Sequence, residues 1–248
     1  MRNYKMTIAY DGTKYQGWQR QNTTEQTIQG ILEQELSRQI GYAVEIDGSG
    51  RTDGGVHALG QVANVKLSGK VEEEALQSAL NANLPEDIRI REIRLVKNKF
   101  HSRYSARAKR YVYTVDFREK PCVFTRKYCG HYTRPLEIER MRQRAALLVG
   151  THDFGGFTDK KDEMSTVRTI YEIEIRNTKH RGQLQIMFQG DGFMYHMVRI
   201  LTGTLLEIGS GEKEPEVIRE IFQSRKRSDA GFLAPASGLC LEEVFYEM

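Results

Sequence analysis

The chain has 248 residues, of which 39% are hydrophobic and 28% are charged, and its formal net charge is +4. This is the composition of a globular protein that is long enough for one large domain or two modest halves. No apolar run approaches the roughly 18 residues that a membrane-spanning helix needs, and the three cysteines fit neither a disulfide framework nor a zinc site. Because the first residues lack the apolar core of a signal peptide, we expect a cytoplasmic protein without a metal or a membrane partner.

The first part of the chain alternates strand and helix patterns. In chain order, the pattern predicts a strand over 2–10, a helix over 25–40, two strands that flank residues 48–58, a helix over 71–82 and a strand over 88–96. The second part repeats this texture, with strands near 110–117 and 126–133, a helix over 137–149, strands over 166–176 and 183–189, helices over 193–208 and 215–224, and a last strand over 239–246. These spacings predict an α+β fold, in which helices cover one face of a largely antiparallel sheet.

The most informative segment is GSGRTDGGVHA at residues 48–58. It holds four glycines, and ordering each glycine costs backbone entropy. The simplest interpretation is a tight turn in which Thr52 and Asp53 bond their own backbone. The flanking strand patterns favour instead a loop at a sheet edge, where catalytic groups tend to lie. Arg51 would share a side with Asp53 on an extended segment and would keep the carboxylate ionised, although a purely structural ion pair is the alternative.

A basic strip follows at residues 97–110, with no acidic residue in it. Its basic residues are Lys97, Lys99, Arg103, Arg107, Lys109 and Arg110. Phe100 and Tyr104 lie among them, and Tyr111 comes directly afterwards. Cations interleaved with aromatic rings suit a phosphate backbone with stackable bases, so we predict contacts to an RNA backbone. A solvated charged loop is the alternative.

Six segments in order along the chain carry further motifs. They are YDGTKYQGWQ at 10–19, GSGRTDGGVHA at 48–58, FHSRYSA with RYVY at 100–113, GTHDF at 150–154, FMYHMVR at 193–199 and APASGL at 234–239. Together they resemble the motifs of the tRNA pseudouridine synthase A family. Two positions depart from the family pattern: Gly54 stands where alanine is usual, and Leu233 stands where threonine is usual.

The resemblance implies roles for particular residues. Asp53 takes the place of the family's nucleophilic aspartate, and Tyr111 that of the tyrosine that stacks on the target uracil. Arg199 would pair with Asp53, Arg51 would fill the space that the extruded base leaves, and Leu239 would line the uracil pocket.

The resemblance also implies the architecture and the reaction. Two similar α/β halves, residues 1–106 with Asp53 and residues 107–248 with Tyr111 and Arg199, would join their sheets around a central cleft. The enzyme would isomerise uridine to pseudouridine in the anticodon stem-loop of tRNA, at positions 38–40. It would act as a homodimer and need no metal or organic cofactor.

Two other functions remain open from the residues alone. One is an RNA-binding protein that has lost catalysis. The other is a nucleotide or glycoside hydrolase that pairs Asp53 with a second acid such as Asp11 or Asp47. Residues 150–154 are interpreted as a turn that is structural or faces RNA, and His196 as a satisfied core or interface histidine. Whether Asp53 attacks the ribose C1′ or promotes loss of the C2′ proton is not settled by the sequence.

Overall fold

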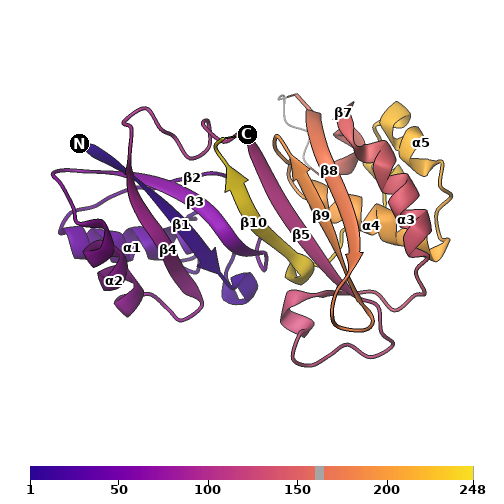
Figure 1. Cartoon of the computed structure of the whole chain (residues 1–248), viewed down its shortest axis with the longest axis horizontal. Helices are drawn as coiled ribbons and strands as arrows, with labels where there is room; N and C mark the ends of the chain where they lie inside the picture. The colour runs from indigo at the N-terminus through magenta and orange to yellow at the C-terminus, as the bar shows by residue number, and fades with distance from the viewer. Residues whose placement is uncertain (160–164, 248) are drawn as a thin grey trace. The chain divides into compact units, whose positions relative to one another are not determined.

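The computed structural model describes residues 1–159 and 165–247, which divide into two compact units (Figure 1). Unit 1 contains residues 1–107 and the segment from Cys240 onwards, and unit 2 contains residues 108–239. The division differs from the predicted halves in one respect. The last strand, β10 (Leu239–Phe245), belongs with unit 1 because it pairs in parallel with a strand of that unit through Cys240 and Leu241.

Unit 1 is built on a mixed sheet. Its strands are β1 (Arg2–Tyr10), β2 (Asp47–Gly48), β3 (His57–Leu67), β4 (Ile88–Val96) and β10. The strand order is β4-β1-β3-β10, in which β1 runs antiparallel to both β3 and β4. The short β2 pairs with β3 in antiparallel fashion, and this pairing sets the start of the segment at 48–58.

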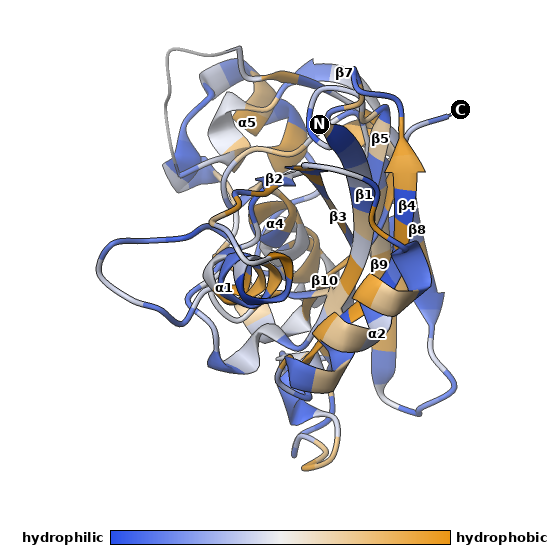
Figure 2. Cartoon of the chain, turned by 90° about the vertical axis from the view of Figure 1, so that its left-hand side faces the viewer, coloured by the Kyte–Doolittle hydropathy of each residue, from blue (hydrophilic) through white to orange (hydrophobic). Residues whose placement is uncertain are grey.

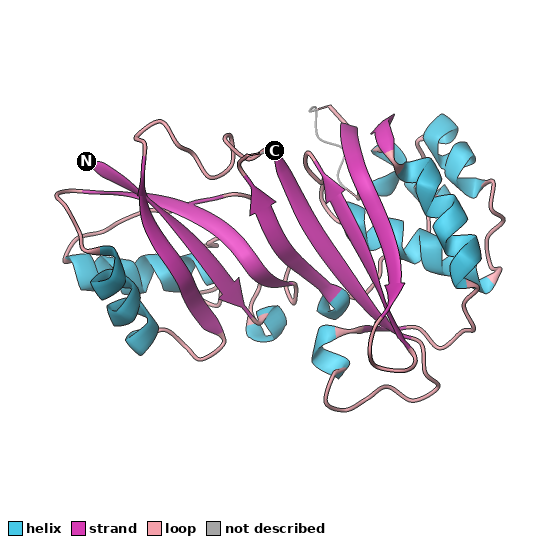
Figure 3. Cartoon of the chain, in the orientation of Figure 1, coloured by secondary structure: helices cyan, strands magenta, loops and turns pink. Residues whose placement is uncertain are grey.

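Helices pack against the sheet of unit 1 (Figure 3). They are α1 (Ile28–Ile40) and α2 (Glu73–Asn83); α2 packs against β4 and α1 packs against α2, so both cover one face of the sheet. Helix α1 begins three residues later than predicted because Thr27 is its N-cap, with a side-chain oxygen that accepts from Gly30 N. It ends at Gly41, whose φ of 85° lies in the left-handed region.

The segment before β2 does not form the predicted strand. Val44 and Ile46 are buried, but the backbone there bonds to helix α1. Ile46 N donates to Glu33 Oε1 at 3.0 Å, and Gln29 Nε2 donates to Ile46 O at 3.2 Å. Side chains of the helix therefore satisfy backbone groups that a neighbouring strand would otherwise satisfy. The alternation of apolar and polar residues around Val44 and Ile46 therefore reflects burial against helix α1 and not a strand.

Unit 2 has an antiparallel sheet. Its strands are β5 (Ala108–Asp116), β6 (Gly130–His131), β7 (Gly150–Asp153), β8 (Val167–Asn177) and β9 (Gln183–Gly190). The order is β5-β9-β8-β7, and β6 adds a short parallel pair to β5. The turn predicted at 150–154 is wrong, since most of it is β7, which pairs with β8. Four residues are too few to show the period-two pattern of a strand, and the turn was expected only from the resemblance of GTHDF to a family motif.

In the described part of unit 2 the α-helices are α3 (Ile138–Ala145), α4 (Met197–Ser210) and α5 (Val217–Ser224). Helix α4 is apolar over most of its surface (Figure 2) and nearly all of its residues are buried. It begins four residues later than predicted, because His196 has a left-handed φ of 63° that interrupts the helical path. Both units thus combine largely antiparallel sheets with covering helices, which confirms the predicted α+β class.

Candidate functional site

Asp53 lies on the loop between β2 and β3 of unit 1. Val56 N donates to Asp53 O at 3.1 Å and closes a tight turn, while Trp18 N donates to Thr52 O at 3.0 Å and ties the loop to the preceding segment. The Asp53 side chain is half-buried. The loop therefore holds a carboxylate at the edge of a sheet, in a fixed backbone path.

Close packing explains some of the glycines around this loop. A Cβ added to Gly48 would lie 2.4 Å from Trp18 Nε1, and a Cβ added to Gly17, which has a φ of 94°, would lie 2.7 Å from Thr52 O. At Gly54 the nearest atom, Tyr15 O, would be 3.5 Å away, which is an ordinary contact. The alanine that is usual in the family would therefore fit at position 54.

Buried polar side chains support the loop from inside unit 1. Tyr10 Oη and Thr52 Oγ1 are hydrogen-bonded at 2.8 Å, Ser49 Oγ donates to Gln61 Oε1 at 2.7 Å, and Gln61 Nε2 donates to Gly50 O at 3.0 Å. Burial raises the pKa of Tyr10, so its hydroxyl stays protonated. Sequence analysis did not single out Gln61. A polar residue inside the apolar pattern of β3 is the signal that could have found it.

Arg51 has a different environment from the one that its spacing predicts. Its side chain is exposed, and Nε donates to Gln19 Oε1 at 3.0 Å. Gln19 in turn donates to Gln29 Oε1 at 2.6 Å, and Gln29 donates to Glu33 Oε1 at 2.9 Å. A chain of amides thus connects the Arg51 guanidinium to helix α1, and the guanidinium contacts Gln19 rather than the carboxylate of Asp53.

The two acids that a hydrolase could use are both engaged by histidines. Asp11 Oδ1 lies 3.2 Å from His57 Nδ1, and Asp47 Oδ2 lies 3.9 Å from His101 Nε2.

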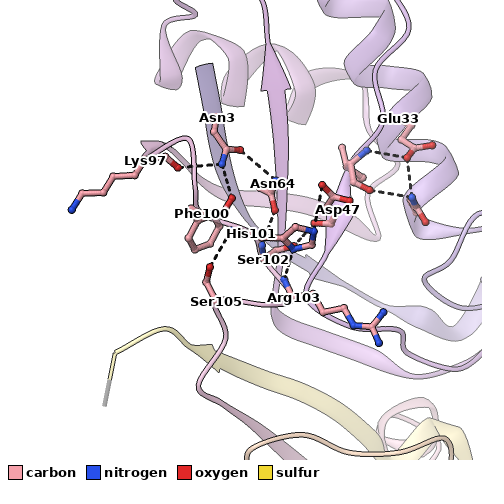
Figure 4. Close-up of polar contacts among 12 residues, drawn as sticks. Asn3, Glu33, Asp47, Asn64, Lys97, Phe100, His101, Ser102, Arg103 and Ser105 are labelled. Carbon is pink, nitrogen blue, oxygen red and sulfur yellow. Dashed lines mark hydrogen bonds and ion pairs between the residues drawn. The ribbon is translucent and has the colours of Figure 1, made fainter. Parts of the chain in front are cut away.

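The first part of the basic strip is a loop that buried amides hold in place (Figure 4). Asn3 Nδ2 donates to Phe100 O at 2.8 Å, Ser102 N donates to Asn64 Oδ1 at 2.7 Å, and Asn64 Nδ2 donates to Asn3 Oδ1 at 3.3 Å. Asn3, Asn64 and Ser102 are all buried. The main chain of residues 97–105 is therefore anchored by hydrogen bonds to the sheet of unit 1.

Most of the charged side chains of the strip point into solvent. Lys97, Lys99, Arg103 and Arg107 are exposed, and Tyr104 is 78% exposed with the Arg103 guanidinium 5.9 Å from its ring centroid. The remaining two basic residues lie on β5 of unit 2 and are half-buried. There, Nε and Nη2 of Arg110 donate to Gln189 Oε1 at 3.1 and 2.7 Å.

Tyr111 lies on β5, where its register partner is Phe188 of β9. Its ring is buried and makes an edge contact with Phe193 at 5.3 Å between centroids. Tyr113 follows on the same face of the strand, and its hydroxyl donates to Pro235 O at 2.8 Å. The predicted tyrosine is therefore part of a row of rings that reaches the loop at 234–239.

Arg199 lies in the first turn of α4 and is fixed to the same loop. Its Nε donates to Ala234 O at 2.7 Å, and Ala234 N donates to Arg199 O at 3.4 Å. Burial raises the pKa of Tyr113 while the positive charge of Arg199 opposes that rise, so the guanidinium lies within electrostatic reach of the phenol. Leu239 is buried at the end of this loop. Arg199 of α4 and Tyr113 of β5 are thus bonded to the same loop of unit 2, at Ala234 and Pro235.

No group of three or more His, Cys, Asp or Glu side chains within residues 1–159 and 165–247 is arranged to hold a metal ion. Across that same part of the chain, every helix is too short or too polar to cross a membrane.

Comparisons with known proteins show which family the chain belongs to. A family described as tRNA pseudouridine synthase matches residues 6–105 and 145–247. The tRNA pseudouridine synthase A of Bacillus sp. (strain KSM-64) is 48% identical over 99% of this chain and 100% of its own length. The enzyme of the same name from Lacticaseibacillus casei (strain BL23) is 43% identical over the same shares of the two chains.

A more distant relative, the tRNA pseudouridine synthase A of Thermoanaerobacter sp. (strain X514), is 41% identical over 99% of this chain and 100% of its own length. A crystal structure of a Cbf5-Nop10-Gar1 complex aligns with 82% of this chain and 45% of that chain, at 11% identity and a TM-score of 0.38, and no conclusion rests on it. The family match and the full-length relatives confirm the resemblance that the motifs carry. The chain belongs to the tRNA pseudouridine synthase A family, a family of isomerases.

Proposed function

We propose that this chain isomerises uridine to pseudouridine in the anticodon stem-loop of tRNA, at positions 38–40. The observation that carries the proposal is the Asp53 carboxylate on a rigid glycine loop, in a chain whose relatives align over their full length. The glycosidic bond between N1 and C1′ breaks, the uracil turns, and a carbon–carbon bond forms between C5 and C1′; the proton lost from C5 is balanced by one gained at N1. Atoms and electrons balance within the substrate itself, so the reaction consumes no second reactant.

The target uracil must leave its base stack before Asp53 can reach the sugar. Arg51 is suited to occupy the vacated space, because its side chain is exposed and the hydrogen bond from its Nε to Gln19 orients the guanidinium. A planar guanidinium can stack on neighbouring bases and donate several hydrogen bonds.

Asp53 then acts on the ribose, either by attack at C1′ or by promoting loss of the C2′ proton. Tyr111 stacks on the uracil, and its buried ring is held against Phe193. Arg199 acts together with Asp53 in the reaction, a role that the family resemblance supports. Leu239 supplies an apolar wall for the base.

The tRNA backbone lies along the basic strip. Lys97, Lys99, Arg103 and Arg107 are exposed on an anchored loop, and Lys109 and Arg110 continue the strip on β5. Each phosphate contact that is lost should reduce the salt dependence of tRNA binding by about one unit of slope. Titrations in rising salt with Lys97→Gln and Lys99→Gln test this, with the exposed Lys70→Gln as a control of equal charge change. Equal slopes for all three variants would count against the strip.

The functional protein is a cytoplasmic homodimer in which one tRNA contacts both copies. The family resemblance supports this assembly. Light scattering of the purified chain, alone and with tRNA, tests it, and a monomer at micromolar concentration in both samples would contradict it.

The decisive experiment maps pseudouridine on unmodified tRNA transcripts with the wild type and with Asp53→Ala. Pseudouridine in the anticodon arm with the wild type alone is the expected result. Bound tRNA without any pseudouridine would favour an RNA-binding protein that lacks catalysis. Release of free uracil would favour a hydrolase.

A further inference from the structure

One carboxylate in unit 2 joins two segments that are distant in sequence. Asp159 Oδ2 lies 2.6 Å from His196 Nδ1, and Asp159 Oδ1 accepts from Arg227 Nε at 2.7 Å. His196 directly precedes α4, and Arg227 begins a short 3₁₀ turn after α5. About a third of each side chain or less is exposed. Burial raises the pKa of Asp159, but the hydrogen bonds from His196 and Arg227 outweigh it and keep the carboxylate ionised at neutral pH.

The first segment contains a strained residue. His196 has a φ of 63° and a ψ of −2°, a left-handed conformation that persists in a non-glycine residue only where its surroundings enforce it. The change of direction at His196 leads from the turn that places Phe193 against Tyr111 into the helix that carries Arg199. Asp159 bonds the side chain of His196, and its neighbour Thr158 donates to Tyr195 O at 2.9 Å. Asp159 therefore fixes the side chain of His196, and Thr158 fixes the backbone directly before it.

The second segment is the loop that fixes the Arg199 side chain. Arg227 Nη1 donates to Gly231 O at 2.9 Å, and Gly231 N donates to Thr204 Oγ1 of α4 at 2.8 Å. Three residues later, Ala234 O receives the hydrogen bond from Arg199 Nε. Asp159 thus acts through Arg227 on the loop that binds the guanidinium of Arg199.

We infer that Asp159 is a positioning residue for the reaction, because it fixes together the backbone from which Arg199 projects and the loop to which the Arg199 side chain is bonded. The inference rests on the role of Arg199 in the proposed function. Asp159 itself touches neither the uracil nor the ribose. Its removal should loosen the guanidinium and slow the chemical step, while tRNA binding through the basic strip stays unchanged.

The test compares two carboxylates of unit 2. In Asp159→Asn the single-turnover rate should fall about tenfold or more at saturating enzyme, with a tRNA Kd within about twofold of the wild type. Asp153→Asn is the matched control, since Asp153 also accepts from Thr166 at 2.6 Å and pairs with Arg225 at 3.2 Å but holds neither segment around Arg199. It should lower the Tm by a comparable amount and leave the rate unchanged. Equal rate losses in the two variants would overturn the inference.

A double-mutant cycle separates positioning from general destabilisation. Arg199→Ala alone should slow the reaction, and adding Asp159→Asn to it should change the rate by less than about twofold. Rate losses that multiply would overturn the inference and leave the proposed function standing, whereas a full rate in Arg199→Ala would remove the premise. If Asp159→Asn does not fold, Arg227→Gln removes the same link from the other side and should give the same separation between rate and Kd.

Discussion

The two units support their catalytic candidates in different ways. Asp53 of unit 1 lies on a loop that is held by individual hydrogen bonds, from the backbone of Trp18 to Thr52 O and from buried side chains such as Gln61, which donates to Gly50 O, and Tyr10, which bonds Thr52 Oγ1. Tyr111 and Arg199 of unit 2 lie on a regular strand and a regular helix. Their backbones are fixed by the ladder of β5 with β9 and by the turns of α4.

This difference predicts where each unit is vulnerable. The loop depends on a few individual hydrogen bonds, some of them from side chains of β1 and β3, so their loss should alter the reactive group directly. A strand or helix is fixed by many equivalent bonds, so its weak points are the contacts between elements. In unit 2 these contacts are the ones that bind the loop at 230–239 to α4 and β5.

The largest effect expected in unit 2 comes from Arg199→Ala. Loss of a preorganised charged donor from a catalytic site typically lowers kcat by about 10²–10³-fold. The KM for tRNA should change little, because Arg199 is bonded inside unit 2 and lies outside the basic strip. Steady-state kinetics with tRNA transcripts measure both constants, and Arg199→Lys should retain part of the rate. A variant that loses tRNA affinity at unchanged kcat would show that Arg199 binds substrate and does not serve Asp53.

The next effect concerns the loop of unit 1. In Gly48→Ala the new Cβ would meet the indole of Trp18 at 2.4 Å, and overpacking of this kind costs about 1–3 kcal/mol in the free energy of unfolding. Gly48 is the last residue of β2; Gly54→Ala, six residues further on in the loop itself, meets no atom closer than 3.5 Å and should be neutral. Urea unfolding of both variants provides the comparison. Equal stability would mean that the loop tolerates packing changes as a regular element does, and the contrast between the units would fail.

The catalytic candidates of the two units could not be identified equally well from the sequence. The Asp53 loop was identifiable from its residues, because clustered glycines between strand patterns signal a constrained backbone. Tyr111 and Arg199 were identifiable only through the family resemblance, since a tyrosine in a strand and an arginine in an apolar helix look ordinary. Most element positions followed from hydrophobic periodicity.

What periodicity missed depends on contacts between segments. The α1 side chains that replace a strand at Val44 and Ile46, the left-handed His196 and the link through Asp159 all join residues that are remote in sequence. No local pattern encodes such pairs. The short strand β7 was missed for another reason, because it offers too few residues to show a period.

A pH-dependent effect should separate the units further. In unit 2 the Arg118 guanidinium holds the pKa of the buried Asp116 carboxyl well below its usual range, and Cys122 N also donates to that carboxylate. Because the folded pKa is lowered, this stabilisation is present above the unfolded pKa near 4 and is lost as the pH falls through the folded value. Asp116→Asn should cost about 1–2 kcal/mol at pH 7 and progressively less as the pH falls below about 4.

The matched control for this effect lies in unit 1. Hydrogen bonds from the Arg38 guanidinium lower the pKa of Glu35 on helix α1, but more than half of the Arg38 side chain is exposed to solvent. Solvent screening weakens such pairs, so Glu35→Gln should change the acid limb of the stability curve much less than Asp116→Asn. Thermal unfolding between pH 2 and pH 7 measures both. If both variants lose the acid limb of the stability curve equally, burial does not determine how much these carboxylates contribute to the pH dependence of stability.

The smallest effect tests the contrast most closely, because a buried tyrosine hydroxyl bonds the loop before β3 in unit 1 and the loop before β10 in unit 2. Tyr10→Phe removes the partner of Thr52 next to Asp53, and Tyr113→Phe removes the donor to Pro235 O. Each change should cost about 1 kcal/mol of stability. The loop of unit 2 keeps other bonds, including Ser237 Oγ to the Cys129 carbonyl at 3.0 Å, so Tyr113→Phe should leave kcat nearly unchanged.

In unit 1 the bonded hydroxyl group lies directly beside the reactive group. Thr52 directly precedes Asp53, so a hydroxyl that turns to find a new partner moves the backbone that aims the carboxylate. Tyr10→Phe should therefore lower kcat by several-fold at the same cost in stability and at an unchanged KM for tRNA. The ratio of rate loss to stability loss in the two variants is the quantity to compare. A ratio that is equal in the two units would show that both loops are supported in the same way, whatever their place in the fold.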